Sequence, residues 1–265
     1  MHKHIVDVLI EERATQLMSR PFLWRQVKRL FYPVLGYRHA VHTIDTVAPM
    51  DALSTFKHLS RRLELKVTAE GTEHIPAQGG AIVAANHPAG IADGVAMFDV
   101  LRQVRQDITF FANRDALRAA PNLAEMLIPV EWVDEKRNHA RNRETVTHMV
   151  RAFRAGRIIV MFPSGRLARP TVRGLQEREW TTTVANLAQR YGVPVLPAHI
   201  RARNSWLYYL LYVLNDELKD MTLFRELLNK EGQPYRIRVG APMSAQGDVA
   251  EATAAIRRRV LEDLA

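Results

Sequence analysis

The chain has 265 residues, of which 47% are hydrophobic, so it is long enough to bury the core of one α/β domain. It contains no cysteine, which excludes disulfides, cysteine-ligated zinc, iron–sulfur clusters and a thiol nucleophile, and mildly favours a reducing compartment. Its formal net charge of +9 attracts nucleic acid, anionic lipid or phosphorylated substrates without choosing among them.

The beginning of the chain, MHKHIVDVLIEERATQ, carries acidic residues and lacks a long apolar core, so we expect no secretory signal. No stretch reaches about 18 uncharged apolar residues, so we expect no ordinary transmembrane helix.

Residues 20–38 have the pattern of an amphipathic helix, in which Arg25, Lys28 and Arg29 fall opposite a Trp/Phe/Leu face. This pattern is typical of a helix that lies in a membrane interface. A surface helix packed on the protein's own core fits it equally well. Pro33 predicts a kink or two short helices. With a further helix at 48–63, residues 1–62 are expected to form a helical segment that interacts with the membrane.

From residue 63 onward, predicted strands alternate with predicted helices. The strands are expected at 63–71, 81–86, 107–113, 127–133, 157–163, 193–200 and 234–240, and the helices at 92–104, 139–156, 181–192, 205–218, 221–230 and 248–264. The alternation predicts a single α/β domain over residues 63–265, with a mostly parallel or mixed sheet flanked by helices. Sites in such folds gather where the carboxyl ends of strands meet helix N-termini.

The run WLYYLLYVL at 206–214 is unusually apolar and aromatic. It fits a helix that lines an acyl-chain channel or dips into the membrane, and it fits a buried core helix equally well.

His87 and Asp93 lie on either side of a predicted turn between a strand ending near Asn86 and the next helix. A carboxylate in the first helical turn is favoured by the exposed N–H groups there. If Asp93 accepts a hydrogen bond from one imidazole nitrogen, the other nitrogen is left free to take a proton, as a general base requires. The spacing alone also fits a helix cap beside an unrelated loop histidine. A catalytic pair requires the Asp93 carboxylate to lie within hydrogen-bond reach of His87, directly or through one water.

Four blocks of sequence, NHPAGIADG (86–94), FFANRDALRAAP (110–121), VMFPSGRLARP (160–170) and GVPVLPAHI (192–200), follow one another along the chain. In this order they resemble the four blocks of the glycerolipid acyltransferase family, whose members include the 1-acylglycerol-3-phosphate acyltransferases. The resemblance covers roughly residues 65–245.

Two blocks depart from the common family pattern. The usual first block has four residues between His and Asp, which would place the acid at Ala92, a residue that cannot act; Asp93 is therefore the candidate, in a His-x5-Asp arrangement. The usual third block reads Phe-Pro-Glu-Gly-Thr-Arg, whereas here Ser164 replaces the glutamate and Arg166 directly follows Gly165.

The resemblance implies that His87 is the general base for a hydroxyl of a lysolipid such as lysophosphatidic acid, and that Asp93 orients it. The acyl group would come from the thioester of acyl-CoA or acyl carrier protein as co-substrate, with no metal or other cofactor. The protein would act as a peripheral membrane enzyme of phospholipid biosynthesis at the cytoplasmic face of the membrane, without nucleic acid as a partner.

The same resemblance assigns the substrate-binding residues. Arg114 is the cation of the second block and the first candidate for an acceptor phosphate, because its planar guanidinium matches phosphate oxygens. Arg169 and Arg173 form a basic cluster with Arg166 on the turn-rich loop after the strand of the third block, where they fit headgroup contacts and a solvated loop equally well. The other substrate-binding candidates are Asn86, Phe162, Pro163, Ser164, Gly165 and Arg166.

Two other functions remain open at this point. An acyl-ester hydrolase would release free fatty acid without an acceptor, although a serine nucleophile is not expected because the Gly-x-Ser-x-Gly elbow is absent. A non-catalytic basic protein that binds nucleic acid or anionic membrane would show salt-dependent binding that is insensitive to His87 and Asp93.

Overall fold

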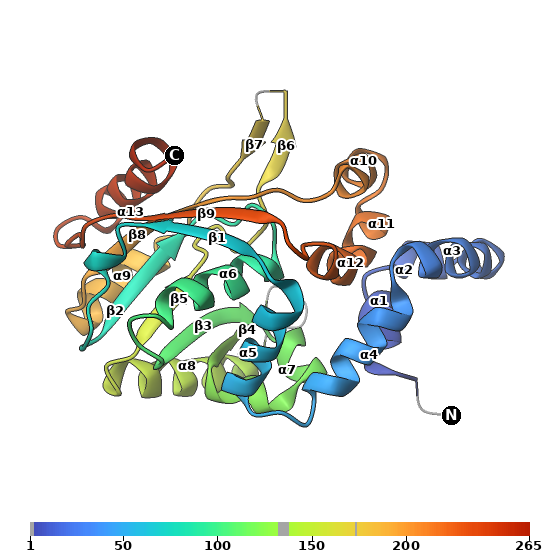
Figure 1. Ribbon diagram of the computed structural model, residues 1–265, viewed down its shortest axis with the longest axis horizontal. Helices are drawn as coiled ribbons and strands as arrows, with labels where there is room; N and C mark the ends of the chain where they lie inside the picture. The colour runs from blue at the N-terminus through green and yellow to red at the C-terminus, as the bar shows by residue number, and fades with distance from the viewer. Residues whose placement is uncertain (1–2, 132–137, 173) are drawn as a thin grey trace.

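A seven-stranded sheet lies at the centre of the computed structural model, which describes residues 3–131, 138–172 and 174–265 (Figure 1). Its strands in chain order are β1 (Lys66–Glu70), β2 (Ala81–Ala85), β3 (Ile108–Asn113), β4 (Leu127–Val130), β5 (Ile158–Met161), β8 (Val195–Arg201) and β9 (Pro234–Val239). The spatial order is β1-β9-β8-β2-β5-β3-β4, and each neighbouring pair is parallel except β8 and β9. The predicted α/β fold with a mostly parallel, mixed sheet is therefore confirmed.

Helices cover both faces of the sheet because the side chains of each strand alternate between the faces. In β2, Val83 and its odd-numbered neighbours join a core with α5 (Ala52–Leu63) and α6 (Ile91–Leu101). Ile82 and Ala84 join a second core on the other face. The helices of that face are α8 (His139–Arg154), α9 (Thr183–Tyr191) and α13 (Val249–Arg258). Every residue of β2 is buried, which places this strand at the centre of the fold.

The N-terminal helices pack against two helices from the C-terminal part of the chain. The helices concerned are α1 (Ile5–Glu11), α2 (Thr15–Met18), α3 (Pro21–Val34), α4 (Tyr37–Val47), α11 (Asp216–Met221) and α12 (Leu223–Leu228). Their contacts form a third apolar cluster, in which Trp24, Ile44 and Met221 are buried. The carboxylate of Glu217 also accepts the backbone N–H groups of Gln16 and Leu17 at 2.7 and 2.9 Å. The expected helical N-terminal segment is thus present and is tied to the rest of the chain by contacts far apart in sequence.

The break that Pro33 predicts falls just beyond that residue. Helix α3 continues through Pro33 and ends at Val34, and α4 begins at Tyr37 after Gly36, whose φ of 64° lies in the left-handed region that favours glycine. Among the described residues, no helix is both long enough and apolar enough to span a membrane.

Two elements extend the structure beyond the sheet. An antiparallel hairpin of β6 (Arg169–Thr171) and β7 (Gly174–Gln176), which the sequence pattern did not predict, projects from the body of the protein (Figure 1). Helix α10 (Trp206–Leu214) lies between this hairpin and the N-terminal helices (Figure 1).

Two short elements, α7 (Asp115–Ala119) and the 3-10 turn Pro121–Glu125, connect β3 to β4. The last residues of the strand expected at 127–133, Trp132 and Val133, lie outside the described residues.

The parallel strands β8, β2, β5 and β3 direct their carboxyl ends to the same edge of the sheet. His87 follows β2, Phe162 follows β5, and Arg114 follows β3. The first three sequence blocks are therefore brought to one edge, as expected for sites in open α/β sheets.

Candidate active site

His87 and Asp93 are in direct contact. The Nδ1 atom of His87 lies 2.9 Å from Oδ2 of Asp93, so the contact required of a catalytic pair is present without a bridging water. The Asp93 side chain is fully buried, whereas the His87 side chain keeps 17% of its surface exposed. Because the carboxylate accepts from Nδ1–H, the Nε2 atom carries the free lone pair of the neutral imidazole.

The turn between β2 and α6 explains how five intervening residues still allow this contact. Gly90 precedes the helix with φ 88° and ψ −140°, a conformation open essentially only to glycine. The Asp93 Oδ2 atom accepts the backbone N–H groups of Ala89 at 2.8 Å and Gly90 at 3.0 Å. Asp93 is therefore both the cap of α6 and the hydrogen-bond partner of His87. The two interpretations of its position in the sequence, a helix cap and a partner for His87, do not exclude each other.

The third block lies against the imidazole. The ring of Phe162 stacks on His87 with a centroid separation of 4.1 Å and an interplanar angle of 19°. The block then makes a tight turn in which the Gly165 N–H donates to the Phe162 carbonyl at 2.9 Å, and Gly165 has a φ of 63°. The Pro163 carbonyl accepts from both the N–H and the hydroxyl of Thr181 at 3.1 Å each. Phe162 thus limits rotation of the imidazole, and the turn holds Phe162 in place.

Sequence reasoning missed Glu177, which directly follows β7 and lies beside the catalytic turn. Its Oε2 atom accepts the backbone N–H of His87 at 3.1 Å. Its side chain is buried, and this burial raises the pKa of the Glu177 carboxyl, while the nearby Ser164 hydroxyl and the hydrogen bond from the His87 N–H oppose that rise. The only signal in the sequence was the loss of the usual glutamate from position 164, which says nothing about where a substitute would come from.

Two predicted substrate-binding residues already have protein partners. The buried amide of Asn86 donates to the Ile200 carbonyl at 2.9 Å and accepts the Ile200 N–H at 2.7 Å, so it bridges β2 and β8. The guanidinium of Arg114 forms an ion pair with Glu144 and donates to the Arg141 carbonyl at 3.2 Å. In this structure both side chains stabilise the edge of the sheet, and direct contact with substrate stays a prediction for each.

The remaining basic candidates lie at the surface. Arg166 is exposed immediately after the turn, where its carbonyl accepts the Ser164 hydroxyl at 2.8 Å. Arg169 is also exposed, and its guanidinium donates to Gln176 across the hairpin at 2.8 Å. Arg173 lies outside the described residues. Arg166 is therefore the candidate that lies closest in the chain to the turn and remains exposed to an arriving headgroup.

A buried tyrosine lies near the Asp93 carboxylate. Tyr235 on β9 is almost completely buried, and both this burial and the nearby charge of Asp93 raise the pKa of its phenol. Tyr235 therefore stays neutral and places a hydroxyl dipole, rather than a second charge, near Asp93. The strand that supplies it lies more than 100 residues after Asp93 in the chain, so this neighbour was not predictable from local sequence patterns.

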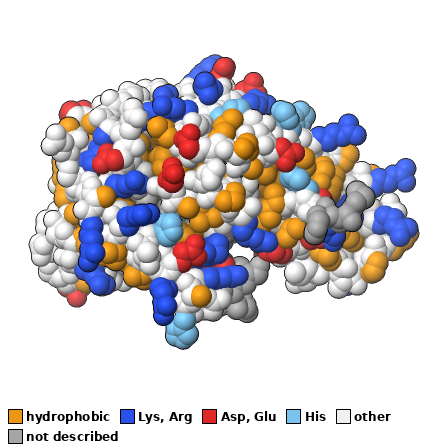
Figure 2. Space-filling view, turned by 90° about the horizontal axis from the view of Figure 1, so that it is seen from below, with side chains coloured by type: hydrophobic (Ala, Val, Ile, Leu, Met, Phe, Trp, Pro, Cys, Tyr) orange, Lys and Arg blue, Asp and Glu red, His pale blue; other side chains and the backbone are white. Residues whose placement is uncertain are grey.

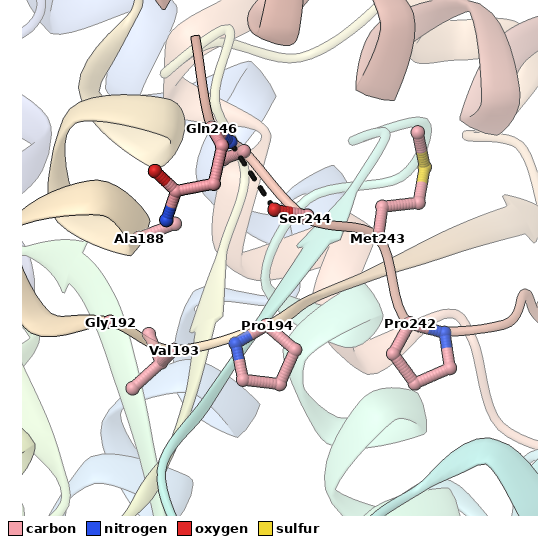
Figure 3. A pocket seen from close by; sticks show the side chains of 9 residues that line it. Ala188, Gly192, Val193, Pro194, Pro242, Met243, Ser244 and Gln246 are labelled. Atoms are coloured by element: carbon pink, nitrogen blue, oxygen red, sulfur yellow. Dashed lines mark hydrogen bonds between the residues drawn. The ribbon is translucent and has the colours of Figure 1, made fainter.

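Two cavities lie at the opposite edge of the sheet from His87. One pocket is lined by residues 192–194, which precede β8, and by residues 242–246, and the side chains drawn around it include no acid or base (Figure 3). The other is lined by Glu125, His148, Arg151 and Arg157 near the amino ends of β4 and β5. Over residues 3–131, 138–172 and 174–265, no group of three or more His, Asp or Glu side chains could hold a metal ion. Neither cavity is lined by His87 or Asp93.

The structure thus places a histidine held by a buried aspartate at the turn after β2, beside the Phe-Pro turn that follows the neighbouring strand β5. Residues 66–201, slightly more than half of the chain, match the sequence model of the acyltransferase family. The chain belongs to this family.

Curated relatives include two proteins named lyso-glycine lipid O-acyltransferase. The one from Phocaeicola vulgatus is 25% identical over 191 residues, which cover 69% of this chain and 66% of the relative. The one from Bacteroides thetaiotaomicron is 29% identical over 151 residues, which cover 56% of this chain and 53% of the relative. The matches thus span just under two thirds and about half of these proteins.

The fold also resembles a solved structure along nearly its whole length. The crystal structure of the 1-acyl-sn-glycerophosphate acyltransferase PlsC from Thermotoga maritima superimposes with a TM-score of 0.51 and 16% identity, and the match covers 96% of each chain. At this identity the likeness establishes the shared fold, including the N-terminal helices before the first strand.

Proposed function

We propose that this protein is a lysolipid O-acyltransferase that moves a fatty acyl group from a thioester, acyl-CoA or acyl carrier protein, to a free hydroxyl of the lysolipid. The observation that carries the proposal is the 2.9 Å contact between His87 Nδ1 and the buried Asp93 carboxylate, next to the Phe-Pro turn of the third block. Family membership supports the reaction class, and the relatives support a lipid acceptor.

The geometry suits a general-base mechanism. The Nε2 atom of His87 takes the proton of the acceptor hydroxyl as its oxygen attacks the thioester carbonyl. Asp93 keeps the ring in the tautomer that exposes Nε2 and stabilises the imidazolium that forms. The tetrahedral intermediate then collapses, the carbon–sulfur bond breaks, and the thiolate leaves with the proton returned by the imidazolium. The products are the acylated lipid and the free thiol, and no covalent acyl-enzyme is required.

The acceptor headgroup is the less defined part of the proposal. The relatives named for lyso-glycine lipid act on an acceptor that differs from the lysophosphatidic acid named for PlsC. Arg114, the expected phosphate ligand, is paired with Glu144, which reduces its availability for a phosphate. We therefore favour a lysolipid whose recognition does not depend on a phosphate held by Arg114.

One product analysis tests the function. Purified protein is incubated with radiolabelled acyl-CoA or acyl carrier protein and with lysophosphatidic acid, lyso-glycine lipid or no acceptor. We expect labelled diacylated lipid that depends on the acceptor. Labelled free fatty acid formed equally well without an acceptor would indicate a hydrolase instead. The absence of any labelled product with each acceptor would contradict the enzymatic function.

We further propose that helices α3 and α10 bind the membrane peripherally. On α10, Trp206 is 74% exposed and Val213 is 79% exposed, although Tyr208 and Leu211 on the same helix are buried. On α3, the exposed apolar residues are Phe22, Leu23, Leu30 and Val34. Both helices therefore have one apolar face packed on the protein and a second apolar face open to solvent, which is characteristic of interfacial binding.

The charge distribution favours a lipid surface over nucleic acid. Arg25 and Arg29 are exposed on α3 beside its apolar residues. On the face shown in Figure 2, Lys and Arg side chains are dispersed among acidic and hydrophobic ones rather than gathered into one strip. A dispersed charge of this kind supports weak attraction to an anionic bilayer, and the exposed apolar side chains supply the remaining affinity.

Sedimentation with phosphatidylglycerol-containing vesicles tests the membrane proposal. We expect the double variant Trp206→Ser/Val213→Ser to bind at least about tenfold more weakly, since each side chain loses on the order of 1.5–3 kcal/mol of apolar burial. Val146 on α8 is also about half exposed, at 49%, so Val146→Ser is a matched control that should bind as wild type does. Equal vesicle binding by all three proteins would show that α10 does not contact lipid.

A further inference from the structure

The hairpin segment holds the backbone of His87 from both sides. The Ala168 N–H, just before β6, donates to the His87 carbonyl at 2.9 Å. The Glu177 carboxylate, just after β7, accepts the His87 N–H at 3.1 Å. Asp93 and Phe162 fix the imidazole ring, whereas these two contacts fix the peptide from which the ring projects.

The Glu177 carboxylate lies in a protected position that still has one open acceptor. The residue is 8% exposed. Its Oε1 atom is buried and has no hydrogen-bond partner within residues 3–131, 138–172 and 174–265, and the same holds for the indole Nε1 of Trp180. The Ser164 hydroxyl and the Trp180 indole lie near the carboxyl and lower its pKa, against the effect of burial. A buried carboxylate oxygen without a hydrogen-bond partner is rare in proteins, so its presence here requires a structural or functional reason.

Position 164 supplies that explanation. The family's usual third block has a glutamate where this chain has Ser164, and the carboxyl group beside Ser164 in the structure is that of Glu177. A carboxylate is therefore retained next to the Phe-Pro turn, although it is provided by a different segment of the chain.

We propose that Glu177 is a positioning residue for the transfer reaction and replaces, from the end of the hairpin, the carboxylate that position 164 lacks. The role rests on the proposed function, because it acts through the His87 general base. Glu177 sets the position of the His87 peptide, and the next residue, Arg178, donates to the Tyr212 hydroxyl of α10 at 3.2 Å. The same short segment thus connects the catalytic turn to the helix proposed to contact lipid.

The first test compares steady-state kinetics of Glu177→Ala with wild type. We expect kcat to fall about 10- to 100-fold, because a small displacement of a catalytic group lowers the rate steeply, while KM for the lysolipid changes less than about threefold. Glu177→Gln should stay within about threefold of wild type, since its amide oxygen can accept the same N–H. Glu179, exposed two residues away, provides the matched control Glu179→Ala, which should be unaffected.

The second test transfers the carboxylate back to the third block. In the double variant Ser164→Glu/Glu177→Ala, we expect kcat to recover at least about fivefold over Glu177→Ala, because the new side chain places a carboxylate beside the same turn. If Glu177→Ala does not fold, Glu177→Asp, which retracts the carboxylate by one methylene group, takes its place in both comparisons.

A third measurement does not depend on activity. Exchange of the His87 backbone amide, followed by NMR in histidine-labelled protein, should be at least about tenfold faster in Glu177→Ala than in Glu179→Ala. Wild-type kcat and unchanged His87 exchange in the Glu177 variant would overturn the positioning role, and a folded double variant without recovery would overturn the replacement of position 164. If the wild-type protein is inactive but its His87 amide still exchanges more slowly than that of Glu177→Ala, the result contradicts the proposed function and not the contact between Glu177 and His87.

Discussion

Replacing His87 by alanine is expected to lower kcat for acyl transfer by about 10³-fold or more, because it removes the group that takes the hydroxyl proton. The His87 side chain contributes one hydrogen bond to Asp93 and one stacking contact to Phe162, and it is partly exposed. Its removal should therefore leave the fold intact. The measurement is kcat with the acceptor that wild type uses, together with the thermal unfolding midpoint.

A second histidine serves as the control for this variant. His42 is exposed on α4, and His42→Ala should retain wild-type kcat. If a folded His87→Ala protein kept more than about a tenth of wild-type kcat, His87 would not be the base, because loss of a general base lowers rates by at least about 10²-fold.

Replacing Asp93 separates its electrostatic role from its role as a cap. In Asp93→Asn, the amide oxygen can still accept the N–H groups of Ala89 and Gly90, so the first turn of α6 should persist. The negative charge that stabilises the imidazolium is lost, however, and kcat should fall by about 10²- to 10⁴-fold. Kinetics and circular dichroism on the same preparation measure the two effects.

Asp93→Ala should lose stability as well as activity. It leaves two buried backbone N–H groups without an acceptor, which should lower the free energy of unfolding by about 2–4 kcal/mol. Asp99→Asn, on the same helix but bonded to Ser60 and Arg102, is the matched control for activity. An Asp93→Asn protein with wild-type kcat would show that the carboxylate only caps the helix.

Much of the fold follows from patterns that are local in sequence. Each of the seven strands of the main sheet was predicted within a few residues, because buried strands bounded by turns are marked by short apolar runs. The insertion of β9 between β1, to which it is parallel, and β8, to which it is antiparallel, was not predictable, because strand order depends on contacts between distant segments. The hairpin of β6 and β7 was missed because its strands have three residues each and no alternation of apolar side chains.

In the candidate site too, contacts within one segment of the chain were predictable, whereas contacts between distant segments were not. The contact between His87 and Asp93 was predictable, because both residues belong to one turn whose direction is set by Gly90. Glu177 was not, because it reaches His87 across 90 positions from a polar stretch without periodicity. The first and second sequence blocks correctly predicted that Asn86 and Arg114 lie at the edge of the sheet. They could not predict the partners of these side chains, because Ile200 and Glu144 belong to other segments of the chain.

The place of β9 in the sheet has a consequence for how the protein is made. β1 lies at the edge of the sheet and pairs with β9, which is translated long after it. During synthesis β1 therefore lacks its sheet partner until β9 has been made, and such non-local pairing slows folding. Because β9 also carries Tyr235 close to Asp93, the surroundings of this buried carboxylate are complete only once β9 has joined the sheet. Pairing of β1 and enclosure of Asp93 therefore depend on the same late strand.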